Sequence, residues 1–575
     1  MKFFEAIGSA LANHETVSTA FLTAMRFVFP VLIFLVLYRC ARSLLTFRKQ
    51  PEIWAWLNIG GETNLPVTHW ENMIGRGKGC DIVVDLQTIS RSHAVLTRYD
   101  DGSWSISDVA SRGGVQVDGQ TVGIKAIGFG EPFQLGGVDF WLEPVTREER
   151  EEQAIYRTKP GRKIKPETTL FFLTVFQILA MLQLILNVGE ADVANVAIGF
   201  GALIVLEWLI FLVFRLMRRT GYEVETIAFF LCTMGVAVMA TAAPGDIKKE
   251  IIAMVMGIVL FFIVGWSLRS LERAKKVRYL AAALGLALLL FNLVFGKEVY
   301  GAKNWIILGP FSFQPSELVK VCFVFVGAST MDRIVSKRNL ILFIAYSAAI
   351  CGCLALMRDF GAALIFFAAF LVIAFLRSGD FAALALICAG TGFGGVLAAR
   401  FLPYIQKRFA AWGHVWELAT DAGYQQTRAM MCIASGGLFG LGAGLGWLKY
   451  VAASDTDLVF ALVSEEWGLL VGLMMILAVV MLAAFVVRSV AVARSSFYTI
   501  GACAAACILM MQVILNVFGT VDFLPLTGVT FPFVSNGGSS MMAAWGLLGF
   551  IKAADTRQNA SFAIKLPSRK EDPDE

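Results

Sequence analysis

The stretch Ser454-Asp455-Thr456-Asp457-Leu458-Val459-Phe460-Ala461 marks the point where a long polar loop enters the apolar run of residues 458–487. A carboxylate in or beside hydrocarbon costs about 3 kcal/mol or more, so Asp457 is a candidate functional residue. The alternative is structural, because aspartate is also a favourable N-cap and Asp457 would then be a solvated helix start. The segment by itself leaves both interpretations open.

Apolar runs of similar character recur along the chain. Its 575 residues are 57% hydrophobic and 16% charged, with a mean hydropathy of +0.68, whereas soluble chains carry about 25% charged residues. Runs of about 18 or more apolar residues can cross a bilayer, so we predict an all-α polytopic membrane protein. We expect thirteen spans, at residues 21–37, 168–188, 193–216, 223–243, 250–268, 278–296, 316–332, 339–357, 360–376, 381–401, 458–487, 497–521 and 530–553.

Two of these runs need comment. One bilayer crossing takes about 20 residues, so the run 458–487 is expected to tilt or to extend beyond the membrane. The first run, 21–37, lacks a clear small-residue cleavage site, so we expect a retained membrane helix rather than a signal peptide.

The cysteines and histidines indicate no metal or disulfide site. The ten cysteines are scattered, and only Cys351 and Cys353 are close together, while the four histidines are dispersed. No CxxC or Cys/His metal spacing occurs. The net charge of +5 is small and its basic residues cluster in short loops, which is a topology signal, so we expect no nucleic-acid partner.

Charge also predicts the orientation of the spans. If residues 50–167 are cytoplasmic, the loops on the same side are basic except for the near-neutral turn 377–380, as the positive-inside rule requires. An odd number of spans then places the N-terminus outside. The long loops 297–315 and 402–457 also face outward, against the trend in charge, and we expect their cations to serve something anionic. These cations are Lys297, Lys303, Lys407, Arg408, Arg428 and Lys449.

Residues 50–145 differ from the rest of the chain. Short runs with period-two alternation, such as Asp81-Ile-Val-Val-Asp85 and Val138-Asp-Phe-Trp-Leu142, are broken by Gly and Asp. This spacing predicts a small β-sandwich. The residues 146–167 that follow form a charged linker.

Several polar motifs interrupt the membrane part. Pro315 and Ser316 suit a helix start, and Glu317 and Lys320 are one turn apart, where they could form a helix-end ion pair. The string Ser435-Gly-Gly-Leu-Phe-Gly-Leu-Gly-Ala-Gly444 follows no strand, so it favours close helix packing over a nucleotide loop. The Gly/Pro-broken segment 516–540 requires burial in protein or a cavity wall.

Five segments in order resemble the SEDS family (shape, elongation, division and sporulation) of membrane proteins. They are Trp305-Ile with Gln314-Pro-Ser-Glu-Leu-Val-Lys320, Asp359-Phe-Gly361, Gly423-Tyr-Gln425 with the glycine string, Thr456-Asp-Leu-Val-Phe-Ala461 with Glu465-Glu466, and Leu524-Pro-Leu-Thr-Gly528 with Gly537-Gly-Ser-Ser540. The resemblance covers about residues 223–553 and implies a core of ten transmembrane helices, with about three extra N-terminal spans. Asn304 and Asn536 stand where the family often has Arg and Tyr.

The resemblance implies a peptidoglycan glycosyltransferase that polymerises lipid II on the outer face of the bacterial cytoplasmic membrane, with a class B penicillin-binding protein as a transpeptidase partner. Asp457 falls on the family's proposed catalytic aspartate, where it could act as a general base or hold a divalent cation such as Mg²⁺ or Mn²⁺. Outer-loop cations could neutralise the leaving lipid diphosphate. The expected substrate-binding residues are Lys303, Trp305, Gln314, Ser316, Glu317, Lys320, Lys407, Arg408, Gln425, Arg428, Thr527, Ser535, Ser539 and Ser540.

Glu465 and Glu466 are interpreted differently. They lie about 12 Å beyond Asp457 on an ideal helix, and neither sits directly beneath it at about 100° per residue. We therefore expect them to be structural partners of buried polar groups rather than a second catalytic carboxylate.

Residues 55–142 resemble a forkhead-associated (FHA) domain through Gly75-Arg76, Ser90-Arg91-Ser92-His93 and Ser111-Arg112-Gly113-Gly114. The resemblance implies phosphothreonine binding by Arg76, Ser90, Arg91, Ser111 and Arg112, with His93 as a structural support. A phosphate dianion suits Arg and hydroxyl donors. Such a domain suggests control by a Ser/Thr kinase pathway, while Arg112, in place of the usual Asn, leaves open an interaction module without phosphate recognition.

The expected organisation has six parts. They are residues 1–49 (outer N-terminus and first span), 50–145 (cytoplasmic FHA-like domain), 146–167 (linker), 168–221 (extra hairpin), 222–555 (polymerase core) and 556–575 (cytoplasmic tail). Two other functions stay open, a lipid II flippase and a non-catalytic scaffold for a transpeptidase. A flippase should carry charges midway in several spans, and few are visible; the retained Asp457 argues against an idle scaffold.

Overall fold

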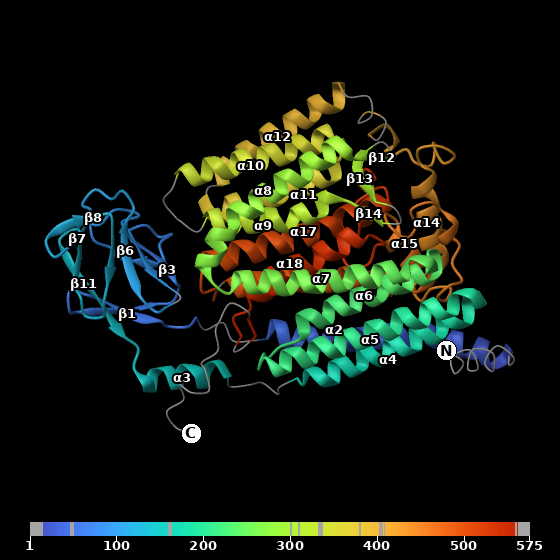
Figure 1. Cartoon of the computed structure of the whole chain (residues 1–575), viewed down its shortest axis with the longest axis horizontal. Helices are drawn as coiled ribbons and strands as arrows, with labels where there is room; N and C mark the ends of the chain where they lie inside the picture. Colours follow the sequence, from blue (N-terminus) through green and yellow to red (C-terminus); the bar gives the residue numbers. More distant parts are fainter. Residues whose placement is uncertain are drawn as a thin grey trace.

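The structure is a computed structural model that describes residues 15–46, 51–99, 101–158, 164–299, 302–308, 311–331, 337–378, 381–401, 406, 409–490, 492–557 and 560–561. It consists of a β-domain and a large bundle of helices (Figure 1). We call the end of the bundle beside the β-domain the proximal end and the opposite end the distal end.

The β-domain is a sandwich of two sheets with the strand orders β2-β1-β11-β10-β7-β8 and β4-β3-β5-β6-β9. Apolar residues of both sheets, such as Leu57, Leu96 and Phe140, are buried in a core of its own. This confirms the predicted all-β sandwich. The strands are β1 (Ala55–Ile59), β2 (Thr63–Val67), β3 (Glu71–Gly75), β4 (Ile82–Val83), β5 (Ala94–Arg98), β6 (Trp104–Asp108), β7 (Val115–Val117), β8 (Gln120–Val122), β9 (Ile124–Ile127), β10 (Phe133–Leu135) and β11 (Val138–Pro144).

Helices make up almost all of the second part. Among the described residues, nine helices are long and apolar enough to cross a membrane, so the chain is a multi-pass membrane protein. The helices before the first outer loop are α2 (Glu15–Leu45), α3 (Arg147–Thr158), α4 (Pro166–Asn187), α5 (Val193–Leu216), α6 (Glu223–Ala242), α7 (Ile247–Leu268) and α8 (Leu271–Phe295). After it come α9 (Pro315–Met331), α10 (Lys337–Leu356), α11 (Phe360–Ser378), α12 (Phe381–Phe401), α14 (Tyr424–Gly436), α15 (Val459–Glu466), α16 (Leu469–Val490), α17 (Ser496–Thr520) and α18 (Gly538–Ala553).

Helix α6 lies at the centre of the bundle, and residues 223–240 are buried throughout. Helices α2, α4 and α5 lie together along one side of it, where α2 also packs on α16 and α5 on α7 (Figure 1). A small sheet of β12 (Lys297–Val299), β13 (Ala302–Leu308) and β14 (Phe311–Phe313) lies at the distal end with α14 and α15. Each of the thirteen predicted runs contains a helix.

Two predicted spans are wrong in detail. The run 458–487 is broken, because α15 ends at Glu466 and α16 starts at Leu469. Between them Gly468 has a φ of +95°, and a Cβ there would lie 2.4 Å from the Leu438 carbonyl oxygen, so only glycine fits. In the run 530–553, the helix begins only at Gly538, and the preceding residues form an irregular turn.

The β-domain is docked on the loop between α16 and α17. Both carboxylate oxygens of Glu71 accept a hydrogen bond from Ser495 Oγ at 3.0 Å, and one accepts from the Ser496 N–H at 3.1 Å. Arg494 forms a 3.1 Å ion pair with Glu52. The Trp70 and Tyr498 rings are in edge contact with centroids 6.0 Å apart.

Candidate active site

Asp457 lies at the distal end, in a turn that leads into α15. Its N–H donates to the Ala453 carbonyl at 3.0 Å, and Ala453 adopts a φ of +63°. The side chain is half-buried. The N-cap position of α15 is occupied by Leu458, not by Asp457. The structural alternative of a simple helix cap is therefore not supported by the geometry.

The backbone of Asp457 is fixed by α17. Asn516 Nδ2 donates to the Asp457 carbonyl at 3.0 Å and to the Val529 carbonyl at 2.8 Å. This places the turn around Gly528 against the carboxylate. Gly528 has a φ of +68°, and a Cβ on it would lie 3.2 Å from Asp457 Oδ2. The glycine thus lets the backbone approach the carboxylate closely.

The turn before α18 holds the other side of the aspartate segment. Ser535 Oγ donates to the Thr456 carbonyl at 2.5 Å and accepts from the Phe531 N–H at 2.8 Å. Asn536 donates through its backbone N–H to the Asp455 carbonyl at 2.8 Å and through Nδ2 to Asp455 Oδ2 at 2.7 Å. Asn536, which departs from the family pattern, is therefore a partner of Asp455.

A second carboxylate, Asp359, ties the first outer loop to this turn. Its Oδ2 accepts from Asn304 Nδ2 at 3.1 Å and from Gln314 Nε2 at 3.3 Å, and its Oδ1 accepts from the Ala362 N–H at 3.0 Å. The Gln314 N–H lies 3.3 Å from Ser539 Oγ. Asp359 was not among the predicted site residues, although its Asp-x-Gly motif was visible in the sequence.

Gly361 lies where α11 contacts the turn next to Asp457. A Cβ on Gly361 would lie 3.2 Å from Thr527 Cβ, so α11 packs directly on the turn that contacts Asp457. The Thr527 hydroxyl is buried and has no hydrogen-bond partner within the described ranges. Ser540 shares a 2.7 Å hydrogen bond with Thr530 in the same turn. Asp457, Thr527, Ser535, Gln314, Ser539 and Ser540 are thus brought together.

Other predicted substrate contacts have internal partners. Lys303 Nζ donates to the Leu293 carbonyl at 2.8 Å, at the end of α8. Lys320 Nζ forms a 2.6 Å ion pair with Glu317, and their side chains are only 1% and 7% exposed. This is a buried pair rather than the predicted helix-end pair at the interface. Ser316 on the same helix is buried too.

Three of the remaining predicted residues, on or near β13 and α14, lie at the distal end of the bundle (Figure 1). Gln425 Nε2 donates to the Ala452 carbonyl at 3.0 Å, near the Asp457 turn. The Arg428 guanidinium lies over the Tyr424 ring at 5.2 Å, and Trp305 is half-buried in β13. The predicted contacts Lys407 and Arg408 lie outside the described residues.

Glu465 and Glu466 hold the glycine-rich loop, as the structural interpretation expects. Glu465 accepts through Oε1 from the Trp447 N–H and through Oε2 from the Leu448 N–H, both at 2.9 Å. Glu466 Oε2 accepts from the Gly444 N–H at 3.0 Å. Each carboxylate therefore satisfies buried backbone donors instead of facing Asp457.

The β-domain gathers its predicted phosphate-binding residues on adjacent loops. The Arg76 N–H donates to the Ser90 carbonyl at 3.0 Å, and the Arg112 N–H donates to Ser90 Oγ at 3.1 Å. Arg76, Arg91 and Arg112 have exposed side chains, and none forms an ion pair with any described residue. Three such cations on joined loops suit a dianionic ligand.

His93 and Ser111 support these loops. The buried His93 ring accepts from the Ser90 N–H at 3.1 Å through Nδ1 and lies 3.0 Å from the Gly114 carbonyl through Nε2. The Ser111 hydroxyl donates to Asp108 Oδ1 at 2.6 Å and accepts from the Gly114 N–H at 2.9 Å. Its proton is therefore committed to the turn in this structure, whereas it was predicted to contact phosphate.

Metal binding at Asp457 was tested against the residues around it. Across the described part of the chain, no three His, Cys, Asp or Glu side chains are grouped to hold an ion. Mg²⁺ is commonly held by one or two carboxylates together with water and substrate phosphates. A single half-buried carboxylate such as Asp457 fits that mode, and Asp457 is the residue that would supply the protein ligand.

The structural features are matched by comparisons with known proteins. Residues 234–560 match the cell cycle protein family of FtsW, RodA and SpoVE, and residues 72–136 match the FHA domain. The probable peptidoglycan glycosyltransferase FtsW of Tolumonas auensis is 31% identical over 352 residues, which cover 57% of this chain and 90% of that protein. The peptidoglycan glycosyltransferase RodA of Mycobacterium tuberculosis is 28% identical over 334 residues, with coverages of 53% and 69%.

A solved chain of a peptidoglycan synthase complex is 24% identical, with a TM-score of 0.49 over 58% of this chain and 96% of that chain. Fold and site together define a polytopic helical membrane protein that carries an FHA domain. The family match spans more than half of the sequence, and the chain belongs to the FtsW/RodA/SpoVE family of cell cycle proteins.

Proposed function

We propose that this protein is a peptidoglycan glycosyltransferase that polymerises lipid II. Membership of a family whose relatives carry that activity in their names supports the proposal. The observation that carries it is the half-buried Asp457, whose backbone is held by Asn516 and whose carboxylate faces the Gly528 turn. A carboxylate fixed in this way is suited to proton transfer at a membrane surface.

In the proposed reaction, the Asp457 carboxylate accepts the proton of the acceptor's sugar hydroxyl. The hydroxyl oxygen forms a bond to the anomeric carbon of the donor, and the bond from that carbon to the lipid diphosphate breaks. The Thr527 hydroxyl, which has no hydrogen-bond partner among the described residues, lies next to Gly528 and can orient the acceptor through a hydrogen bond. Arg428 at the distal end, with Lys407 and Arg408, can neutralise the departing diphosphate. A divalent cation held by Asp457 would supply further charge neutralisation.

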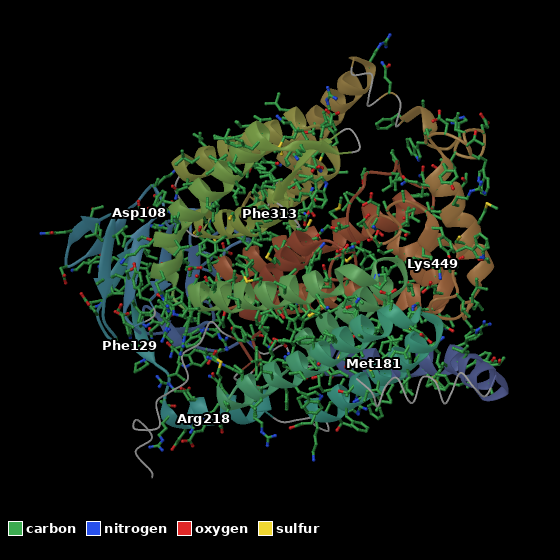
Figure 2. All side chains as sticks on the ribbon, turned by 45° about the vertical axis from the view of Figure 1, so that its right-hand side comes forward. Asp108, Phe129, Met181, Arg218, Phe313 and Lys449 are labelled. Atoms are coloured by element: carbon green, nitrogen blue, oxygen red, sulfur yellow. The ribbon has the colours of Figure 1, made fainter. Side chains whose placement is uncertain are left out.

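The distal end is assigned to the outer face and the β-domain to the cytoplasm. The helix ends and loops at the proximal end are rich in arginine, which supports this orientation. These arginines include Arg215, Arg218, Arg269, Arg273, Arg278, Arg488 and Arg494. Figure 2 shows Arg218 and Lys449 toward opposite ends of the helical bundle, with Asp108 and Phe129 in the β-domain.

Polymerisation of purified lipid II by the full-length protein in detergent tests this function. Asp457→Asn should abolish glycan strands, while Asp421→Asn, an exposed carboxylate in the same outer loop, should leave them unchanged. Equal polymerisation by wild type and Asp457→Asn would refute the role of Asp457. Loss of activity in EDTA with recovery in Mg²⁺ would make Asp457 a metal ligand, and activity that resists EDTA would make it a general base.

The FHA domain is proposed to bind a phosphothreonine-containing protein of a kinase pathway. The three exposed arginines on joined loops support this assignment. Fluorescence anisotropy of the full chain with a phosphothreonine peptide library should show binding that Arg91→Ala removes and that Lys78→Ala, a neighbouring exposed cation, retains. Peptide binding that is unchanged in Arg91→Ala would contradict the assignment. A class B penicillin-binding protein is the proposed transpeptidase partner, to be tested by co-purification.

A further inference from the structure

The glycine-rich outer loop, residues 437–448, lies between two sets of helices at the distal end. On one side its backbone bonds to α15: the Leu441 and Gly442 N–H groups donate to the Glu465 and Glu466 carbonyls, both at 2.9 Å. Gly440 and Gly442 have φ values of +79° and +118°, a conformation that L residues rarely adopt. The loop therefore presents alternate backbone groups to opposite sides.

The carbonyl groups on the opposite side bond to α2 and α4. Arg26 Nη2 on α2 donates to the Leu441 carbonyl, and Asn187 Nδ2, the last residue of α4, donates to the Ala443 carbonyl at 2.6 Å. The Phe27 and Phe439 rings are 4.8 Å apart. Because these carbonyls accept hydrogen bonds from side chains, the support of the loop depends on residues that lie far away in sequence.

Gln183 on α4 adds a polar group to the same contact. Its side chain is buried, with 1% exposure, and its Nε2 lies 3.6 Å from the position that a Cβ on Gly442 would take. Its Oε1 has no hydrogen-bond partner among the described residues. A Cβ on Gly444 would lie 3.0 Å from Asn187 Cβ, so the loop packs tightly on α4.

The loop is connected directly to the aspartate turn. It ends at Leu448, whose N–H is held by Glu465 of α15, and α15 itself begins at Val459, directly after the Asp457 turn. Helices α2 and α4 lie outside residues 234–560, the part of the chain that matches the family. The site is thus braced by two helices that the family match does not include (Figure 1).

We propose that Arg26 and Asn187 are positioning residues for glycosyl transfer at Asp457. They act through the glycine-rich loop and touch neither substrate nor reacting atoms. The inference rests on the proposed polymerase function. A loop held on one side only would let α15 and the Asp457 turn shift, and a displacement of about 1 Å can cost about 100-fold in rate.

The test compares full-length variants in the lipid II assay, with kcat and KM measured separately. Arg26→Met and Asn187→Leu remove the donors while keeping much of the side-chain bulk, and Arg26→Lys restores a donor. Phe34→Leu on α2 and Ile178→Leu on α4 are matched controls, because both side chains are exposed on the outside of the bundle. We expect the double variant to lose about 10-fold in kcat with little change in KM, and Arg26→Lys to recover most of it relative to Arg26→Met.

Hydrogen exchange of residues 441–444 provides a readout that does not depend on activity. Faster exchange in the double variant, with unchanged exchange in the controls, supports the inference. A double variant with wild-type kcat and wild-type exchange overturns it, as does a loss of kcat that Arg26→Lys fails to recover. If the wild type itself makes no glycan, the polymerase function fails, and the exchange result still decides whether these donors hold the loop.

Discussion

At several positions around Asp457, tight packing against the backbone limits the residue type as much as chemistry does. Gly528 shows this most directly, because its φ of +68° would strain any other residue and a Cβ on it would lie only 3.2 Å from Asp457 Oδ2. The two asparagines of this site, Asn516 and Asn536, both bond to backbone of the aspartate segment. Hydrogen bonds from two uncharged residues thus help to fix the backbone of the aspartate segment.

Replacing Gly528 with alanine should damage activity more than stability. The added methyl group strains the left-handed backbone by about 1–2 kcal/mol and pushes on the carboxylate. We expect kcat for lipid II polymerisation to fall about 100-fold, as for a misplaced catalytic group. Gly519→Ala is the matched control, since a Cβ there meets its nearest atom at 3.5 Å. Equal activities for the two variants would show that the Gly528 turn does not set the carboxylate position.

Asp555 offers a pH-dependent test just beyond the end of α18. Burial would raise the pKa of its carboxyl, but the Arg557 charge and hydrogen bonds outweigh burial, and the pKa lies below its ordinary value. Arg557 also pairs with Glu223 at 2.9 Å. A depressed folded-state pKa contributes stability above the unfolded value of about 3.9, and that stability is lost as pH falls through the folded value.

We therefore expect the melting temperature of the purified protein to fall steeply only below about pH 4, in the window between those two pKa values. Asp555→Asn should lower the melting temperature at pH 7, since breaking a buried charge pair costs about 3–5 kcal/mol. In the same variant, the melting temperature should fall less steeply with decreasing pH below about pH 4. Glu190→Gln, at an exposed site, is the control. An equally steep fall below about pH 4 in Asp555→Asn would contradict the assignment.

At the scale of elements, the site depends on how α15 and the glycine-rich loop fit together. The loop crosses the break between α15 and α16, so Gly440 and Gly468 face one another: a Cβ on Gly440 would lie 2.4 Å from the Glu466 carbonyl oxygen. Gly437 has a similar φ of +56° but nothing within 4 Å of its virtual Cβ. Gly437 and Gly440 thus both have a positive φ, but only Gly440 is crowded by neighbouring atoms.

This difference predicts unequal effects of alanine. Gly437 has a ψ of −148°, which with its positive φ is a conformation that essentially only glycine adopts, so Gly437→Ala should cost about 1–3 kcal/mol from backbone strain alone. Gly440→Ala should add about 1–3 kcal/mol of overpacking and separate the loop from α15. Thermal unfolding of both purified variants measures the gap, and polymerisation should fall further in Gly440→Ala. Similar unfolding temperatures would mean that the loop relaxes away from the break without cost.

Sequence patterns predicted this region unevenly. Each long apolar run contained a helix, and the motif order pointed to Asp457, because apolar length and chemically demanding residues leave local signals. Helices α3 and α14, which lie in the predicted linker and the predicted outer loop, were not predicted. The break at Gly468 was missed, because Trp467 and Gly468 sit within a continuous apolar run. The Asn187 bond to Ala443 joins residues 256 positions apart, and the Glu317–Lys320 pair is buried only because of its neighbours. Such contacts are tertiary and leave no periodic trace.

At the scale of the whole molecule, the β-domain is inserted between α2 and α4 and is docked on the start of α17. Helices α2 and α4 hold the glycine-rich loop, and α17 carries Asn516, which donates a hydrogen bond to the Asp457 carbonyl. Arg76, a predicted phosphate contact, directly follows β3, and β3 begins at Glu71, the docking residue. The domain is therefore connected to the distal site by three helices, with a five-residue strand between its ligand surface and its dock.

Glu71→Ala should release the domain from the bundle without unfolding it. The change removes the acceptor of the Ser495 hydroxyl and the Ser496 N–H, whereas the domain's core is separate from that of the helices. Losing hydrogen bonds to a charged acceptor costs about 1.5–3 kcal/mol. We expect hydrogen exchange to rise at residues 494–499 and along β3, while the core strands β5 and β6 keep their protection. Glu62→Ala, at an exposed turn of the same domain, should change neither; exchange in Glu71→Ala that matches Glu62→Ala would show that Trp70 and Arg494 hold the dock alone.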